Sequence, residues 1–301
     1  MSTSRTKGEK TDDQAVQGEE FNRLLRPARA LIGWMTPEQA HLTQVARRAD
    51  APITDEVRDR AMEARKTVQI RPLGVDQTDL VTAAPTELSQ HLIALRAHPP
   101  AAPFFEEGWR VAIVDLARVC AIQPVVFNED AEARVANVEP ADVSSIARVT
   151  LPVEPPEPLA AQQDGTHTSW LFTSRNPNLR VVAQFSGEVQ PGLSAYGFSV
   201  VLTPSYLQVA KFEDRYILRD GYHRSFGLLA RGITHVPAFV RDFESMEQLG
   251  LPPGLLPQTA YLGERPPVLT DYSDDAVAAD VQVPSTQKVI AIQALEYTVM
   301  S

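Results

Sequence analysis

Cysteine and long apolar runs are scarce in this chain of 301 residues, and each scarcity excludes a class of protein. Cys120 is the only cysteine, so the chain can form neither an internal disulfide nor a zinc site built from several thiolates. No apolar run approaches the roughly 18 residues of a membrane helix, and residues 1–20 are polar and charged. We therefore expect no membrane span, no secretory signal and no membrane partner, and we predict a cytoplasmic protein.

Positive charge is also in short supply. The chain has 38 acidic and 28 basic residues and a formal net charge of −10. Because an acidic surface repels a phosphate backbone, this balance disfavours a nucleic-acid partner. The densest basic cluster is predicted from its helical spacing to form a stripe facing solvent or a partner protein, and it consists of Arg23, Arg26, Arg29, Arg47 and Arg48.

Composition divides the chain into four regions. Residues 1–20 have almost no large apolar side chains and are predicted to be a disordered tail. Residues 21–103 show apolar positions every three or four residues and are predicted to be mostly helical. Residues 104–245 contain strand-length apolar runs and form the predicted central domain, whereas residues 246–301 form a Pro-rich extension with a terminal strand.

Individual elements follow from the same signals. Thr36-Pro37-Glu38 marks a helix start, because proline is tolerated in the first helical turn. The acidic, Pro-rich segment 128–163 is predicted to be a long loop with a short strand at 147–153. Helices are expected at 54–66 and 86–97, and strands at 109–116, 124–127, 169–173, 180–185 and 196–202. The helical spacing of the region that starts at residue 21 is seen at Leu24, Leu25, Ala28, Leu31 and Ile32.

The stretch from Tyr216 to Val240 carries the clearest functional signal. It predicts a strand, a tight turn at Asp220-Gly221, and a helix from Tyr222 that Gly232 ends before the next strand. A helix that begins directly after a glycine turn presents unpaired backbone N–H groups and the positive end of its dipole. These features attract a phosphate or a carboxylate, so the turn predicts an anion site.

The side chains after the glycine suit that chemistry. A planar guanidinium such as that of Arg224 can hold a phosphate with two hydrogen bonds. His223 beside it can donate a further hydrogen bond or shuttle a proton. Cations near a helix N-terminus oppose the helix dipole, which indicates that an anion, either a ligand or Asp220, compensates them.

At this point the sequence resembles a known family. Asp220-Gly221-Tyr222-His223-Arg224, followed by a short helix, Gly232 and Val236-Pro237, resembles the Gly-x-His-Arg turn of the ParB/sulfiredoxin superfamily. Val114-Asp115-Leu116 and Gln123-Pro124 are similar to the opening strand and the Gln-containing segment of that fold, so the resemblance covers residues 109–242. It implies an α+β or α/β domain with a mixed sheet and short helices.

The resemblance also implies roles for particular residues. In this superfamily the turn holds the phosphates of a nucleotide, so the expected binding residues are Gly221, Tyr222, His223, Arg224 and Ser225. Asp220 and His223 are the catalytic candidates, and Glu188 and Asp115 are alternative acidic residues for activating a hydroxyl. Tyr222 stands where sulfiredoxin has its catalytic cysteine, so reduction of a sulfinic acid is not expected.

Simpler interpretations stand beside these. His223 and Arg224 would also fix the turn through an ion pair with Asp220, and the Tyr222 ring is as compatible with packing as with stacking on a base. Turn chemistry alone explains His167 and the segment 175–178, and His235 is expected to be structural. No pair of histidines has the spacing of a metal motif, so the sequence predicts no metal ligand.

Three functions remain open from the sequence. The first is a nucleotide-binding protein that hydrolyses the nucleotide or transfers a phosphoryl group, with Mg²⁺ or another divalent cation. The second is a non-enzymatic interaction or assembly subunit, with a protein partner or as a homo-oligomer. The third is a ParB-like nuclease or DNA-binding protein, which the net charge and the absence of a helix-turn-helix after residue 245 disfavour.

Overall fold

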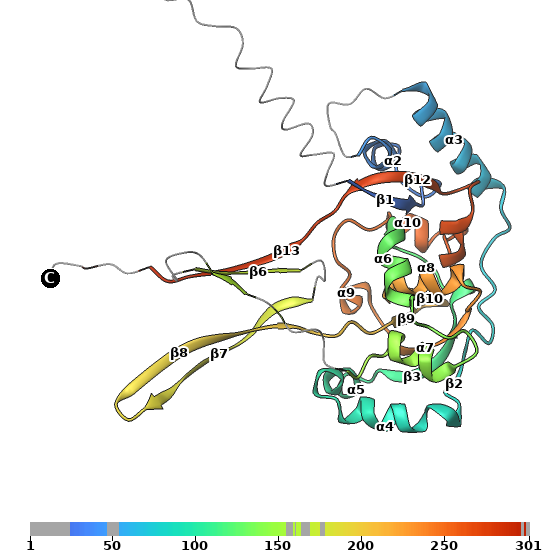
Figure 1. Ribbon diagram of the computed structural model, residues 1–301. Helices are drawn as coiled ribbons and strands as arrows, with labels where there is room; N and C mark the ends of the chain where they lie inside the picture. The colour runs from blue at the N-terminus through green and yellow to red at the C-terminus, as the bar shows by residue number, and fades with distance from the viewer. Residues whose placement is uncertain are drawn as a thin grey trace, which may run out of the picture.

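The computed structural model describes residues 25–46, 54–154, 159, 161–163, 169–174, 178–295 and 298. They form a mixed α/β body from which a long β-structure projects to one side (Figure 1). We call the projecting part the arm, and it comprises β5 (Gln162–Gln163), β6 (Ser169–Ser174), β7 (Leu179–Gln190), β8 (Leu193–Leu202) and β13 (Lys288–Gln293).

A five-stranded mixed sheet forms the centre of the body. Its strand order is β10-β9-β11-β3-β2, in which β9 and β11 are parallel and all other neighbours are antiparallel. The connection from β9 to β11 runs through β10 and helix α8, and it places the start of α8 at the edge strand of the sheet. The bounds are β2 (Val81–Ala83), β3 (Arg110–Asp115), β9 (Gln208–Phe212), β10 (Arg215–Asp220), α8 (Tyr222–Ala230) and β11 (His235–Phe243).

A second sheet joins distant parts of the chain. Strand β1 (Leu25–Ala30) lies between β4 (Val125–Phe127) and β12 (Ala279–Pro284), and both neighbours are antiparallel to it. The helical conformation predicted from the spacing of Leu25 and Ala28 is therefore wrong over β1, because pairing with a strand some 250 residues away overrides the local pattern. Three of the four regions that composition separated contribute strands to this one sheet.

The prediction that basic side chains form a stripe facing solvent or a partner is wrong for the two of these arginines that the structure describes. Arg26 and Arg29 lie on β1 and are buried rather than solvated. Arg26 is paired with Glu129 and Asp130, and Arg29 is paired with acidic side chains near β12. Each buried guanidinium thus has a carboxylate partner, as burial of a charge requires. Arg23, Arg47 and Arg48 lie outside the described residues.

Several predicted helices are confirmed at their starts. Thr36 caps α2, and Thr54 caps α3, each by accepting a hydrogen bond from a backbone N–H in the first turn. The N-terminal region nevertheless contains β1 and β2 as well as helices. The helices are α2 (Pro37–Gln44), α3 (Asp55–Ile70), α4 (Ser89–Ala97), α5 (Ala102–Glu106), α6 (Asn128–Val135), α7 (Val143–Thr150), α9 (Met246–Leu249) and α10 (Gln258–Tyr261), with 3-10 turns η1 (Thr86–Leu88), η2 (Pro99–Ala101), η3 (Leu116–Arg118) and η4 (Leu269–Ser273).

The prediction of a long loop over 128–163 is wrong for the first part of this segment, which contains two helices. Residues 128–135 form α6 and residues 143–150 form α7, and no strand occurs at 147–153. The acidic side chains that suggested a loop lie in the first turn of α6, where they favour the helix dipole. Buried Ala131 and Val135 on α6 supply the apolar face that holds this helix against the body.

The core of the body is continuous from β1 to β12 and is rich in aromatic contacts around Phe239. The Phe239 ring stacks on Phe104 and meets Phe105 and Tyr206 edge-on. Cys120 is fully buried, and desolvation raises the pKa of its thiol to about 11, so it is an inert packing residue. In the described part of the chain, no helix has both the length and the apolar character needed to cross a bilayer.

Candidate functional site

The turn between β10 and α8 requires glycine for two reasons. Gly221 has φ +104°, a backbone conformation that side-chain-bearing residues rarely adopt. A Cβ at this position would also lie 3.0 Å from Cγ of Leu207. The carbonyl of Gly221 accepts the hydrogen bond from Ser225 N at 2.9 Å that closes the first helical turn. The strand, turn and helix predicted from the sequence are confirmed here.

The start of α8 has no cap from its own residues. Gly221 occupies the N-cap and has no side chain that can accept from the helix amides, and no acidic residue lies in the first turn. The amides of Tyr222, His223 and Arg224 have no acceptor within the helix, because a first turn lies before the i−4 carbonyls begin. The positive end of the helix dipole is therefore available to an external anion.

This helix start borders a pocket of about 220 Å³. The pocket is smaller than the roughly 300–1,000 Å³ typical of a site that encloses a whole drug-sized ligand. It is lined by Arg26, Gln123, Phe127, Asp130, Arg134, Ser205, Asp220, Gly221, Tyr222, His223, Arg224, Ser285 and Thr286. Five of the six site residues predicted from the sequence are in this lining. Ser225 is not, since its side chain is fully buried in the body.

Close packing of two helices brings further charged side chains to the pocket. A Cβ on Gly227 of α8 would lie 2.5 Å from the carbonyl oxygen of Ala131 on α6, so only glycine permits this approach. The contact places α6 beside α8, and Asp130 and Arg134 of α6 thereby reach the pocket rim. Neither residue was predicted, because nothing in the local sequence links α6 to the glycine turn.

His223 is a neutral side chain in this setting. Its ring stacks on Phe127, with the ring centroids 5.9 Å apart and the planes 12° from parallel. Burial, followed by the nearby Arg134 cation, lowers the pKa of His223 to about 4. Its Nε2 atom is buried and has no hydrogen-bond partner in the structure. A buried imidazole nitrogen without a partner is uncommon and calls for an explanation.

Arg224 is buried beneath the pocket, with 4% of its surface exposed. Its Nη1 donates to the carbonyl of Val149 at 3.0 Å and to that of Ser205, and its Nη2 donates to Ser205 Oγ at 2.8 Å. Nη1 and Nη2 of Arg224 therefore donate to the protein, although the guanidinium was expected to hold a phosphate with two hydrogen bonds. The Nε atom is buried without a partner. Desolvation lowers the pKa of Arg224 to about 10, so the guanidinium stays charged at neutral pH.

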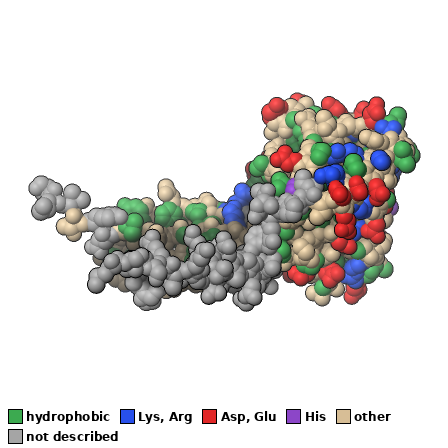
Figure 2. Space-filling model, turned by 90° about the horizontal axis from the view of Figure 1, so that it is seen from above, with side chains coloured by type: hydrophobic (Ala, Val, Ile, Leu, Met, Phe, Trp, Pro, Cys, Tyr) green, Lys and Arg blue, Asp and Glu red, His purple; other side chains and the backbone are tan. Residues whose placement is uncertain are grey.

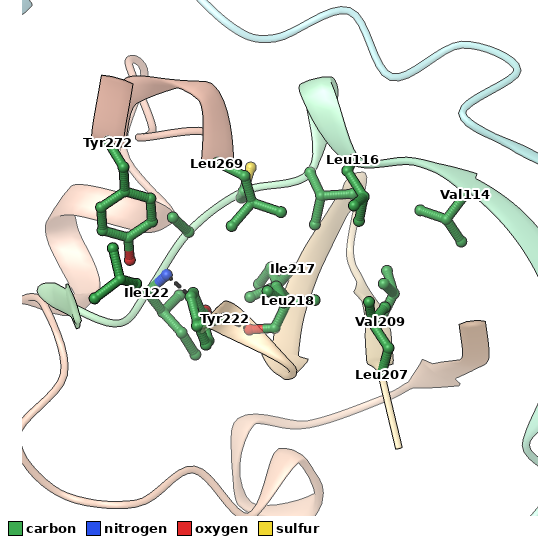
Figure 3. Packing of buried hydrophobic residues seen from close by; sticks show 14 of the residues in the cluster. Val114, Leu116, Ile122, Leu207, Val209, Ile217, Leu218, Tyr222, Leu269 and Tyr272 are labelled. Carbon is green, nitrogen blue, oxygen red and sulfur yellow. Dashed lines mark hydrogen bonds between the residues drawn. The ribbon is translucent and has the colours of Figure 1, made fainter. Parts of the chain in front are cut away.

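Tyr222 packs inside the protein. Its hydroxyl accepts from Ile122 N at 2.9 Å and donates to the carbonyl of Leu218, which ties α8 to the neighbouring segments (Figure 3). Burial raises the pKa of this phenol far above its usual range. The ring is 5% exposed and lies among core side chains, so packing rather than base stacking describes Tyr222.

Asp220 accepts a hydrogen bond from Ser205 Oγ at 3.1 Å and lines the pocket. The alternative acidic candidates lie elsewhere: Asp115 binds Arg118 at 2.8 Å, and Glu188 is on the arm.

His235 is exposed and contacts the Thr234 hydroxyl. His167 and residues 175–177 lie outside the described part of the chain. Among the described residues, no cluster of three or more His, Cys, Asp or Glu has the arrangement of a metal site.

The fold and the pocket define a mixed α/β protein with an uncapped helix start facing a charged recess. No protein-family model, curated protein or solved structure matches the chain.

Proposed function

We propose that the pocket at the Gly221 turn binds the phosphate groups of a nucleotide. One observation carries the proposal. The free end of α8 borders a recess lined by His223 and Arg224, and the Nε2 atom of His223 and the Nε atom of Arg224 are both buried without a hydrogen-bond partner. A phosphate offers several acceptor oxygens, and placed at the helix start it would supply the acceptors that these groups and the first amides lack.

The charges of the lining support an anion of limited size. Three arginines and two aspartates line the pocket, and Arg26 is already neutralised by its two carboxylate partners. Arg224 provides a fixed positive charge from below. Arg134 is exposed and makes no hydrogen bond or ion pair with the described residues, so its guanidinium is free to turn toward a ligand. A bidentate hold on phosphate comes from Arg134 in this proposal, rather than from Arg224.

The volume of the pocket sets how a nucleotide would lie. A recess of about 220 Å³ accommodates phosphate groups, and the sugar and base would lie at its rim near Ser285 and Thr286. Mg²⁺ is usually bound by one or two carboxylates together with substrate phosphates, and Asp220 supplies a carboxylate of that kind, whereas both oxygens of Asp130 accept hydrogen bonds from Arg26. When bound, the ion would neutralise charge on the phosphates. Asp220 is the proton acceptor available for hydrolysis or phosphoryl transfer, and the neutral His223 is assigned to donate its Nε2–H to a phosphate oxygen.

Calorimetric titration tests the proposal with three proteins. Nucleoside triphosphates with Mg²⁺, and inorganic triphosphate as the minimal ligand, are titrated into the wild type, Arg134→Ala and Arg58→Ala. Arg58 is the matched control, since it is an exposed arginine on α3 whose one ion pair is with Asp55. We expect Arg134→Ala to weaken binding about tenfold, equivalent to about 1.4 kcal/mol, and Arg58→Ala to bind as the wild type does. Failure of the wild type to bind either ligand, or equal affinity in all three proteins, would reject the proposal.

A further inference from the structure

The arm contains an edge strand without the usual protection against pairing. In the ten residues of β8 there is no charged residue and no proline. Both irregularities of the β7–β8 ladder lie on β7, at Val182 and Val189, so the bulged residues do not interrupt β8. Within the described part of the chain, β8 pairs with β7 alone, and its outer edge carries unpaired backbone groups. Proteins normally shield such edges with lysine, proline or bulges.

The side chains of the arm are apolar and exposed. Tyr196 is 85% exposed, and Phe185 and Phe198 are each more than half exposed. Apolar groups occupy both faces of the hairpin: Phe185 covers Gly197 on one face, and Tyr196 and Phe198 lie on the other. On the side seen in Figure 2, the coloured arm side chains are mostly hydrophobic, and the Lys and Arg atoms lie near the body. The exposed large apolar residues of the arm are Leu171, Val181, Val182, Phe185, Val189, Leu193, Tyr196, Phe198 and Val289.

We propose that the arm is a dimerisation device, in which the outer edge of β8 pairs antiparallel with β8 of a second copy of this chain. The result is a four-stranded sheet with the order β7-β8-β8-β7. An antiparallel pairing of a strand with itself has two-fold symmetry, so one patch is used twice. A register centred on Gly197 sets Tyr196 of one copy opposite Phe198 of the other, and aromatic cross-strand pairs of this kind stabilise a sheet.

Charge favours a second copy as the occupant. The described arm strands carry only Arg180, Glu188 and Lys288, and β8 carries no charge, so two copies meet without like-charge contacts. Each chain nevertheless has a net charge of −10, most of it on the body. A ten-residue strand extends about 33 Å. That length exceeds the screening distance of about 8 Å at physiological salt, so the arm keeps the acidic bodies far enough apart for their repulsion to be screened.

Exposed apolar side chains on β8 itself can add to this pairing. Leu193, Tyr196 and Phe198 are each more than half exposed, and strand pairing between two copies would bring them into cross-strand contacts. An isolated two-stranded hairpin is only marginally stable in water, and addition of two strands supplies the cross-strand contacts that it lacks.

Sedimentation equilibrium of the full chain tests this inference. The wild type at micromolar concentration should have twice the 33.1 kDa mass of the chain. The double variant Tyr196→Glu, Phe198→Glu places acidic groups opposite each other across the dimer axis and should raise the dissociation constant at least 100-fold. Ile70→Glu is the matched control, because Ile70 is 84% exposed at the end of α3, a helix of the body (Figure 1). It should remain as dimeric as the wild type.

Two results would overturn the inference. One is a wild type that stays at the mass of a single chain up to about 100 µM, including a chain that gains mass only when a different protein is added. The other is a double variant that remains dimeric. Far-ultraviolet circular dichroism and the thermal unfolding of the body should be unchanged in the double variant, which separates loss of pairing from loss of folding.

Discussion

The body and the arm use the same residue types in opposite ways. Phe239 in the body is completely enclosed by Phe104, Phe105 and Tyr206. Phe185 in the arm is 57% exposed, although its strand β7 is the longer one. The body therefore encloses most of its large apolar side chains, whereas the described arm strands leave most of theirs exposed.

The contrast extends to charge. The body buries charged groups and provides a partner for them, as in the ion pair between Arg71 and the buried Asp271. The arm strands have few charged groups to bury or to shield their edges. Two of the buried polar atoms without a partner in the body belong to residues that line the recess, namely His223 and Arg224, whereas in the arm the unpaired backbone groups lie along the outer edge of β8.

The largest difference between body and arm is expected in the free energy of unfolding when one phenylalanine in each region is truncated to alanine. Phe239→Ala removes a fully enclosed ring and is expected to lower the free energy of unfolding by about 3–5 kcal/mol. Phe185→Ala removes a mostly exposed ring and should change the unfolding of the body by less than about 0.5 kcal/mol. Urea titration followed by tryptophan fluorescence in a Trp170→Phe background, which leaves Trp34 and Trp109 of the body as the reporters, measures this. Equal losses in the two variants would mean that arm and body form one cooperative unit.

The pH dependence of stability tests whether His223 is buried and neutral beside the pocket. His223 has a pKa of about 4 in the folded protein and about 6.5 when unfolded, so its neutral form stabilises the fold fully above pH 6.5. As the pH falls toward 4, the unfolded chain binds a proton that the folded chain does not, and stability is lost. Between pH 7 and pH 5 the wild type should lose about 2 kcal/mol more than His223→Gln. Parallel pH profiles for the two proteins would show that His223 is not buried as described.

The smallest expected difference in stability is between the alanine variants of two glycines that have positive φ. Gly221→Ala forces a side chain into a strained backbone conformation against Leu207 and should cost about 1–2 kcal/mol of body stability. Gly192 has φ +80° in the turn of the arm, where a Cβ would meet nothing within 4 Å. Gly192→Ala should strain only the arm and leave the thermal midpoint of the body unchanged. A fall in that midpoint for Gly192→Ala would contradict the separation of the two regions.

The sequence predicted the parts of the fold that local rules determine. The segment from β10 through α8 to β11 was predicted because Gly221 and Gly232 mark its turns, and both have positive φ in the structure. The helix starts at Thr36 and Thr54 were also predicted from local residues, and both threonines cap their helices in the structure. Strand β1 was mistaken for a helix because its identity depends on distant β12, and α6 was missed because its acidic, polar composition concealed the buried positions Ala131 and Val135.

The candidate site shows the same limit. Asp220 to Arg224 are consecutive, so one motif predicted them together, and the structure places them around one pocket. Arg26, Asp130, Arg134 and the segment 285–286 reach the pocket only through sheet pairing and helix packing. The close contact at Gly227 is the one local signal that could have indicated a helix packed against α8, since a glycine inside a helix often marks a close approach.

A crystal structure with a non-hydrolysable nucleoside triphosphate and Mg²⁺ is the most direct test of the central claim. The account predicts phosphate oxygens within hydrogen-bonding distance of the backbone amides of Tyr222 to Arg224, with His223 Nε2 bonded to one of them and the Arg134 guanidinium turned inward. A nucleotide bound elsewhere on the body, or a recess closed by the protein's own side chains while the ligand is present, would contradict it.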